Sequence, residues 1–159
     1  MRHHLAVVYG SYLDLIVTGR KRIECRVLRR WQLPLGEVAP GDQIWFKRRC
    51  GPIEATASVR RVAWYRLNEP AQLEQIRRRF GRRICAEPDF WLSNRDGRYV
   101  GLIWLSRARP CPPLSIRKSD RRSWVVLDGP PQPGQQIRQD HRPRGEMPAW
   151  RDASNKPGA

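Results

Sequence analysis

Acidic residues are scarce in this chain of 159 residues, in which 15 aspartates and glutamates stand against 31 lysines and arginines. The resulting net charge of +16 favours binding to polyanions, because each phosphate that a cation neutralises releases condensed counterions. Arginine supplies 27 of the 31 cations, however, and a GC-rich genome produces such a bias without selection for binding. The charge alone leaves both interpretations open.

Long apolar runs are also absent from the sequence. None reaches the roughly 18 residues that a membrane-spanning helix requires. The apolar stretch at residues 5–17 is interrupted by Asp14 and carries no small-residue cleavage site of the kind that follows a signal peptide. We therefore expect a cytoplasmic protein that does not contact membranes.

The sequence offers little material for a metal or cofactor site. The cysteines lie 25, 35 and 26 residues apart, at Cys25, Cys50, Cys85 and Cys111. This spacing lacks the C-x₂-C pairs of zinc sites, so we expect reduced thiols. Paired carboxylates for metal-assisted cleavage and glycine-rich phosphate loops are missing as well. We expect neither a metal nor a cofactor.

The last part of the chain differs from the rest in composition. Residues 129–159 contain six prolines and four glycines, and their large apolar side chains are Ile137, Met147 and Trp150. Such a stretch cannot offset its own ordering entropy. We therefore predict one folded domain over residues 1–128, which carries most of the positive charge, and a flexible tail over residues 129–159.

Short strands dominate the predicted domain. Apolar alternation predicts strands at residues 3–9, 21–27, 43–48, 53–65 (with a bulge at 60–61), 99–105, 114–117 and 124–127. Helices are predicted at residues 12–18 and 70–80, with Ser11 as the cap of the first and with Gly19 and Gly81 as their ends, and a short helical or irregular piece is predicted at residues 88–93. This order favours an α+β fold, a small mixed β-barrel with two or three flanking helices.

One segment, GRKRIECR at residues 19–26, concentrates charged side chains at a predicted corner between helix and strand. Alternate residues of a strand share a face, so Glu24 lies beside Arg26 and can orient its guanidinium. With Lys21 at the corner, these groups form a candidate grip for a phosphate or a base edge. A solvated strand edge with charged side chains is the alternative.

This segment resembles the G-x-K-x-x-E-x-R signature of the ASCH domain, a member of the PUA-like superfamily. The turn Pro40-Gly41-Asp42, followed by an apolar strand and Lys47, agrees with that family, and the resemblance covers residues 3–128. It implies a β-barrel with a cleft walled by the signature. ASCH domains are expected to bind RNA or other nucleic acid, and their relatives hold modified or flipped bases in aromatic pockets.

The resemblance suggests roles for particular side chains. Lys21 and Arg26 would engage phosphate or base oxygens, and Glu24 would orient Arg26 or accept a hydrogen bond from a base amine. The further candidates for nucleic-acid binding are Arg22, Lys47, Trp31 and Trp45, with Arg77, Arg78, Arg79, Arg82 and Arg83 as an electrostatic extension outside the pocket. Trp45 points away from its apolar neighbours, and Trp31 follows the signature.

Catalysis stays open as an alternative. One branch of the family resembles an amidohydrolase that deacetylates N4-acetylcytidine with a lysine, a threonine and a glutamate. Lys21 matches the lysine, but Glu24 stands where the threonine falls, although a carboxylate can act as a general base on water. The candidates for the distal glutamate are Glu69, Glu74 and Glu87. Hydrolysis of RNA is a further option, with His3 and His4 as acid–base groups if they are not simply an exposed pair.

The sequence therefore predicts a monomer that binds RNA, another nucleic acid or a modified nucleoside through a basic cleft. Whether the chain is an enzyme is left undecided.

Overall fold

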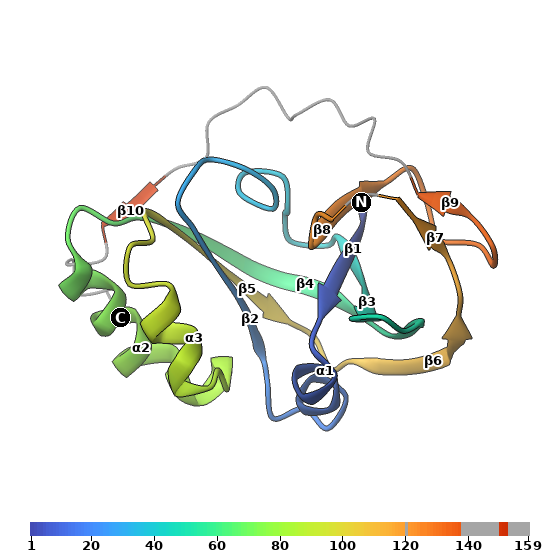
Figure 1. The fold of residues 1–159 in the computed structure, drawn as a ribbon, viewed down its shortest axis with the longest axis horizontal. Coiled ribbons are helices and arrows are strands. Elements are labelled where there is room, and N and C mark those ends of the chain that lie inside the picture. Colours follow the sequence, from blue (N-terminus) through green and yellow to red (C-terminus); the bar gives the residue numbers. More distant parts are fainter. Residues whose placement is uncertain (120, 138–149, 153–159) are drawn as a thin grey trace.

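The computed structural model describes residues 1–119, 121–137 and 150–152, which form a curved sheet with helices at its sides (Figure 1). In pairing order, the main strands are β2 (Ile23–Leu28), β5 (Tyr99–Leu105), β4 (Ile53–Arg66), β3 (Gln43–Arg48), β1 (His3–Val8) and β8 (Trp124–Leu127). All neighbours are antiparallel except β1 and β3, which run parallel. The α+β class predicted from the sequence is confirmed.

Strand β4 joins the two halves of the sheet. Its first half pairs with β3 and with β6 (Arg109–Leu114), and its second half pairs with β5 and with β10 (Trp150–Asp152). The change of partner coincides with a register shift between Val59 and Arg61, where the sequence predicts a bulge. An extra residue at such a bulge bends the strand and increases its twist.

The closed barrel predicted from the sequence is not confirmed. Within the described residues, the pairing path ends at β2 on one side and at β8 on the other, and these two end strands do not pair. A side chain spans the gap instead, because the guanidinium of Arg26 on β2 donates to the carbonyl oxygen of Val7 and to Ser123 Oγ. The open seam between the sheet ends is where the cavity described below lies.

Helix α1 (Gly10–Val17) begins directly after Tyr9, so Ser11 lies inside the helix and does not cap it as predicted. Gly19 has a φ of +75° just beyond the helix end, as its predicted terminating role requires. Leu13 and Ile16 are buried in a core cluster that includes Phe46 and Trp124. This packing fixes the connection that leads into β2.

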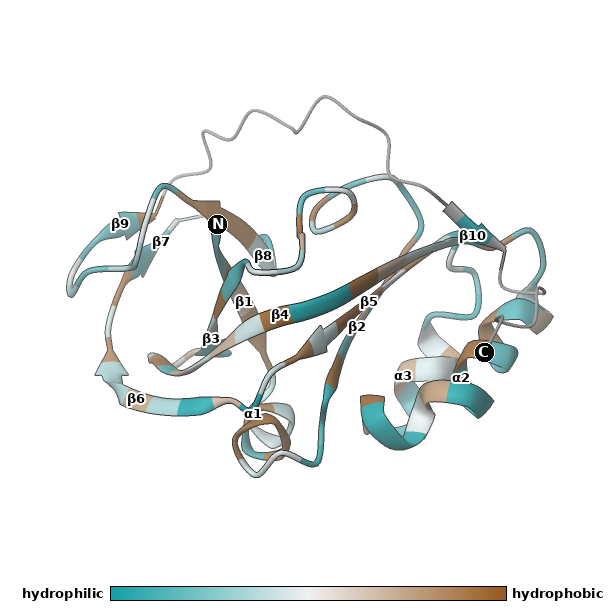
Figure 2. Ribbon diagram, turned by 180° about the vertical axis from the view of Figure 1, so that it is seen from behind, coloured by the Kyte–Doolittle hydropathy of each residue, from teal (hydrophilic) through white to brown (hydrophobic). Residues whose placement is uncertain are grey.

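Helix α2 (Pro70–Ile84) buries an apolar stripe against β2 and β5, with Figure 2 showing hydrophilic stretches elsewhere along it. A capping box between Glu69 and Gln72 starts the helix. Gly81 does not end it, which corrects the prediction, since the helix continues to Ile84 and stops at Cys85 in a left-handed conformation. Helix α3 (Pro88–Ser93) follows with the predicted bounds.

The single strand predicted at residues 114–117 is wrong, because the structure has β6 (Arg109–Leu114) and β7 (Arg117–Lys118) there. Strand β6 tolerates the prolines at residues 110–113 because β4 is its one partner in the described structure. Within the predicted tail, β9 (Gln136–Ile137) pairs with β7, and Ile137 is buried with Leu5 and Val125. The rest of the predicted tail, residues 138–149 and 153–159, lies outside the described residues.

None of the helices in the described part of the chain is both long and apolar enough to span a membrane.

Candidate nucleic-acid interface

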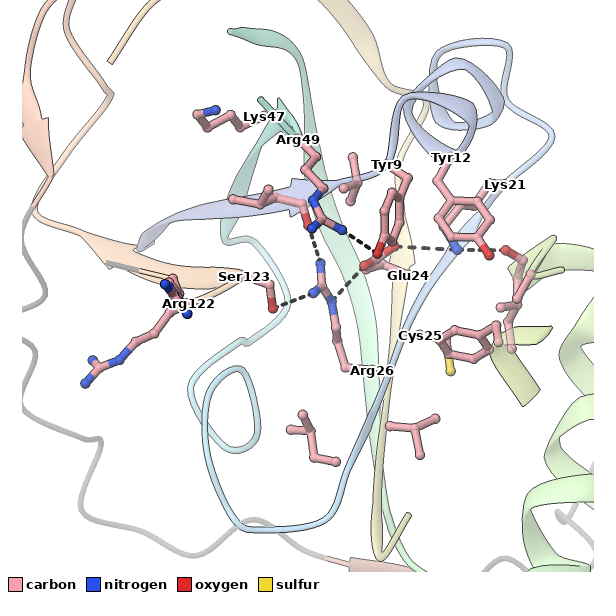
Figure 3. Close-up of a pocket in the computed structure, with 18 of the residues that line it drawn as sticks. Tyr9, Tyr12, Lys21, Glu24, Cys25, Arg26, Lys47, Arg49, Arg122 and Ser123 are labelled. Atoms are coloured by element: carbon pink, nitrogen blue, oxygen red, sulfur yellow. Dashed lines mark hydrogen bonds and ion pairs between the residues drawn. The ribbon is translucent and has the colours of Figure 1, made fainter. Parts of the chain in front are cut away.

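A cavity of about 950 Å³ lies at the open seam of the sheet, between β2 and the β1–β8 side (Figure 3). Seven cationic side chains line it: Lys21, Arg26, Lys47, Arg49, Lys118, Arg121 and Arg122. Glu24 is the one carboxylate among the described residues that line it. Tyr9, Tyr12 and Phe90 add aromatic surface. The cavity thus combines a strong positive charge with rings able to stack on a planar ligand.

Lys21 is buried at the inner end of the cavity, with 4% of its surface exposed. Its Nζ donates to the carbonyl oxygens of Ile84 at 2.7 Å and Ile23 at 3.1 Å, and lies 3.5 Å from Glu24 Oε2. The last carbonyls of a helix lack partners within the helix, so an ammonium is favourable beside Ile84 at the end of α2. Lys21 therefore ties α2 to β2 and has an acceptor for each of its three N–H groups.

Glu24 and Arg26 form the predicted contact between carboxylate and guanidinium. Oε1 of Glu24 lies 2.8 Å from Nε of Arg26, and the Glu24 side chain is 5% exposed. The Nε–H makes no hydrogen bond of good geometry, so the contact is an attraction of charges that leaves a buried donor unsatisfied. The Arg26 guanidinium also lies 5.3 Å from the centroid of the Trp124 ring. Glu24 thus faces the cavity between two cations.

The aromatic wall begins at Tyr9, which is 57% exposed. Arg49 donates to Tyr9 Oη at 2.6 Å, and its guanidinium lies 5.0 Å from the Tyr9 ring centroid. The Tyr9 and Tyr12 rings meet edge to face at 6.3 Å, and Tyr12 Oη accepts a hydrogen bond from the backbone of Glu87. Two tyrosines and an arginine therefore line one side of the cavity, beside Lys21 (Figure 3).

Lys47 and the thiols respond to their surroundings in different ways. Partial burial lowers the pKa of Lys47, and the nearby charge of Lys118 acts in the same direction. An anion in the cavity would offset both effects.

Burial raises the pKa of the Cys25 thiol to about 12, so this group is protonated at neutral pH and is a poor nucleophile. The four cysteines are all free, but Cys50 is exposed, at a φ of +59°.

Several side chains selected from the sequence do not line the cavity. Arg22 is exposed and donates to the carbonyl oxygen of Gly19. Trp31 is 41% exposed and packs edge to face on Tyr99, and Trp45 donates to His3 Nδ1. Trp45 and Lys47 share one face of β3, and Lys47, nearer the end of the strand, lines the cavity while Trp45 does not.

The arginines predicted on α2 also lie away from the cavity. Arg77 and Arg78 are exposed, and each makes an ion pair with Glu74, at 3.5 Å and 3.4 Å. Arg79, Arg82 and Arg83 are exposed as well and do not line the cavity. The acids proposed as a distal catalytic glutamate, Glu69, Glu74 and Glu87, are likewise exposed and absent from the cavity wall.

The histidines do not form the exposed pair that the sequence suggests. His4 is fully buried, with Nε2 3.1 Å from Asp42 Oδ2 and with Nδ1 accepting from Trp124 Nε1 at 3.3 Å. His3 lies at the surface side of the same strand and accepts from Trp45. Neither lines the cavity. In the part of the chain that the structure describes, no cluster of His, Cys, Asp or Glu is arranged to hold a metal ion.

Sequence reasoning missed most of the charged and aromatic side chains that line the cavity. The missed side chains are Tyr9, Tyr12, Arg49, Phe90, Lys118, Arg121, Arg122 and Ser123. Two basic runs were visible, at residues 47–49 and 121–122, each at one end of a predicted strand. They meet because β1 pairs with β3 in parallel and with β8 antiparallel, which brings the end of β3 beside the start of β8. That pairing was the missing information.

The seam, the long shared strand and the helices together define an ASCH-type fold, as the sequence resemblance led us to expect. The crystal structure of ASCH from Zymomonas mobilis matches with a TM-score of 0.55 and 18% sequence identity, over 70% of this chain and 71% of that one. A single-residue variant of the same protein gives 0.57 and 18%, over 72% and 76%. No family model and no curated protein matches the sequence.

Proposed function

We propose that this protein binds RNA by taking one nucleotide into the cavity between β1, β2 and α1. The observation that carries the proposal is the composition of one cavity wall, on which seven cations, one carboxylate and three aromatic rings lie. The volume of about 950 Å³ lies at the upper end of the range for small-molecule sites, which accommodates a nucleotide with adjoining phosphates.

The two ends of the cavity suit different parts of a nucleotide. At the inner end, Glu24 offers carboxylate oxygens to an exocyclic amine, and Tyr12 offers a ring beside it. At the other end, Lys47, Arg49 and Arg122 offer cations to phosphate oxygens (Figure 3). In this arrangement Lys21 acts on the ligand indirectly, because its hydrogen bonds and its ion pair hold Glu24 in place.

Binding accounts for the geometry better than hydrolysis does. A catalytic base or nucleophile needs a free lone pair beside the ligand. The Nζ of Lys21 is held by the carbonyl oxygens of Ile84 and Ile23 and by Glu24, and Cys25 is protonated. Each of these groups would have to leave its partners, or lose its proton, before it could react.

Fluorescence anisotropy with a labelled five-nucleotide RNA, measured at several salt concentrations, tests the proposal. The double variant Lys47→Ala/Arg49→Ala removes two phosphate contacts, so we expect affinity to fall at least tenfold and the salt slope to decrease by about 1.4, at about 0.7 per contact on a single strand. The control, Arg95→Ala/Arg98→Ala, removes two exposed charges that do not line the cavity and should change affinity less than twofold. Equal losses in both double variants would contradict the proposal.

A further inference from the structure

A second group of arginines lies outside the cavity, around a pair of aromatic rings. The four side chains, which we call the arginine patch, are Arg22 before β2, Arg61 on β4, and Arg79 and Arg83 on α2. All four are exposed, and none lines the cavity. The rings beneath them are Phe80 and Trp104, which meet edge to face with centroids 5.6 Å apart.

Close contacts join the members of the patch in two pairs. The guanidinium of Arg61 lies 4.7 Å from the centroid of the Trp104 ring, and that of Arg79 lies 4.8 Å from the Phe80 ring. The backbone N–H of Arg22 donates to the carbonyl oxygen of Arg83 at 2.8 Å. Cation–π contacts hold a guanidinium against a ring while its N–H groups stay available at the edge. Arg61 and Arg79 are thereby held on a fixed surface.

The charge of the patch is uncompensated. Among the described residues, no carboxylate makes an ion pair with Arg22, Arg61, Arg79 or Arg83. The other flank of α2 differs, because Glu74 pairs there with both Arg77 and Arg78. One helix thus carries a flank whose arginines are paired with a carboxylate, the paired flank, and an unpaired one. Like charges gathered without a counter-charge destabilise the free protein and attract an anion.

Structural roles account for part of the patch only. A cation in the last turn of a helix is stabilised by the helix dipole, which covers Arg83 at the end of α2. The effect fades beyond one turn, so it does not reach Arg79, and it does not apply to Arg61, which projects from a strand. Arg61 on β4 and Arg79 on α2 therefore bring uncompensated charge to one pair of rings without a local cause, which points to a ligand.

The patch begins one residue away from the cavity wall. Lys21 and Ile84 line the cavity, where Nζ of Lys21 donates to the Ile84 carbonyl oxygen. Their chain neighbours Arg22 and Arg83 are joined to each other by the backbone bond described above and belong to the patch. The same two segments therefore contribute to both surfaces. A nucleic-acid strand that leaves the cavity past residues 21–22 and 83–84 reaches the arginine patch next.

We propose that the arginine patch binds the phosphodiester backbone of the nucleic acid whose one nucleotide occupies the cavity. The inference rests on the proposed function. It adds a second contact, which depends on the charge of the nucleic-acid backbone and not on the base sequence. Guanidinium groups bind phosphate through two parallel hydrogen bonds, which suits exposed arginines held on rings. A strand too short to leave the cavity gains nothing from the patch, and a longer one gains affinity.

The test compares two double variants of one helix in the full chain. Arg79→Ala/Arg83→Ala removes charge from the patch, and Arg77→Ala/Arg78→Ala removes the same charge from the paired flank. Anisotropy is measured with RNAs of 5 and 25 nucleotides and with a 25-nucleotide single-stranded DNA. We expect the patch variant to lose at least tenfold affinity for the 25-nucleotide RNA and none for the 5-nucleotide RNA, and the matched variant to lose less than threefold for both. Circular dichroism melting checks that both variants fold.

Several results would contradict the proposed role of the arginine patch. Equal losses in the two double variants would show a general effect of charge, and an equal loss for short and long RNA would place the effect in the cavity. Binding to vesicles containing phosphatidylserine, lost only in the patch variant while RNA binding persists, would assign the surface to a membrane. A loss for DNA equal to that for RNA would support the proposal and show that the backbone alone is read.

The two proposals fail in different ways. Suppose that Lys47→Ala/Arg49→Ala leaves every affinity unchanged while the patch variant lowers the affinity for the 25-nucleotide RNA. The cavity is then not the RNA site, and the proposed connection between the patch and the cavity is wrong. If the cavity variant weakens both RNAs and the patch variant weakens neither, the proposed function stands and the patch is overturned.

Discussion

Two buried ionic clusters lie near each other in this fold, and they differ in what surrounds them. His4 and Asp42 are enclosed, with Trp124 on one side and the backbone N–H groups of Arg2 and Ala39 donating to Asp42 on the other. The cluster of Lys21, Glu24 and Arg26 opens onto the cavity.

Burial and ion pairing are common to both clusters, so neither property marks a binding site. The enclosed cluster satisfies its own polar atoms and holds the Pro40-Gly41-Asp42 turn against β1. The open cluster leaves an N–H donor of Arg26 unsatisfied and faces a space of ligand size. Access to a cavity is what separates a structural ion pair from a candidate site. The predictions below test this distinction.

The largest effect is expected for Asp42→Ala. The change removes the acceptor for the buried His4 and for two partly buried backbone N–H groups. Breaking such a pair costs about 3–5 kcal/mol in free energy of unfolding. Urea unfolding measures the loss, and the protein that remains folded should bind RNA as wild type does. A loss below about 1 kcal/mol would contradict the structural role.

A smaller loss of stability is expected for Glu24→Gln, because water in the cavity can solvate the two cations that the carboxylate leaves behind. We expect a loss of about 1–3 kcal/mol in unfolding free energy, typical of a buried polar group that loses a partner. RNA affinity should fall about tenfold, since the acceptor for the base is altered. If stability falls as far as in Asp42→Ala and binding does not change, the two clusters have the same role.

The free energy of unfolding at acid pH should depend on the enclosed cluster. Burial alone would raise the pKa of Asp42, but hydrogen bonds from Arg2, Ala39 and His4 outweigh it and lower the pKa below the usual 3.8. A lowered carboxyl pKa stabilises the fold above the unfolded value, and the stabilisation is lost as pH falls through the folded value. Unfolding free energies measured from pH 6 to pH 2.5 should therefore drop below about pH 4. In Asp42→Asn this part of the drop should disappear; an unchanged acid limb would refute the assignment.

The smallest effects are expected at the tryptophans first selected as stacking residues. Trp45→Phe removes the bond to His3 Nδ1, worth about 1 kcal/mol, and Trp31→Ala removes a half-exposed ring. Neither ring lines the cavity, so RNA affinity should stay within twofold of wild type in both. A tenfold loss in either variant would extend the site beyond the cavity.

Much of the fold follows from local patterns. Alternation and turn residues predict β3, β5, β8 and α3 with the observed bounds, because each depends on its own periodicity. The end of α2 was missed because glycine in a helix costs only about 1 kcal/mol, which the buried Phe80 and Ile84 on either side of Gly81 outweigh. The burial of Ile137 was missed because one apolar residue among prolines carries little signal.

The site was predictable only where it is continuous in sequence. The contact between Glu24 and Arg26 follows from their spacing on one strand, and the structure shows it. Arg49 and Arg122 could not be assigned without the pairing of β1, since they lie far apart in sequence. On α2, by contrast, the pairing of Glu74 with Arg77 and Arg78 follows from their i,i+3 and i,i+4 spacing, a local signal that could have set Arg79 apart from Arg78.

The side chain of Arg26 spans the seam, so its length limits how far the two ends of the sheet can separate. Its guanidinium joins β2 to Val7 and Ser123 across the gap where the sheet does not close. A ligand that binds these same N–H groups competes with Val7 and Ser123. Binding and separation of the sheet ends are then linked equilibria, each shifting the other by the same free energy. Amide hydrogen exchange along β1 and β8 would therefore titrate with ligand, so the sheet edge itself reports occupancy.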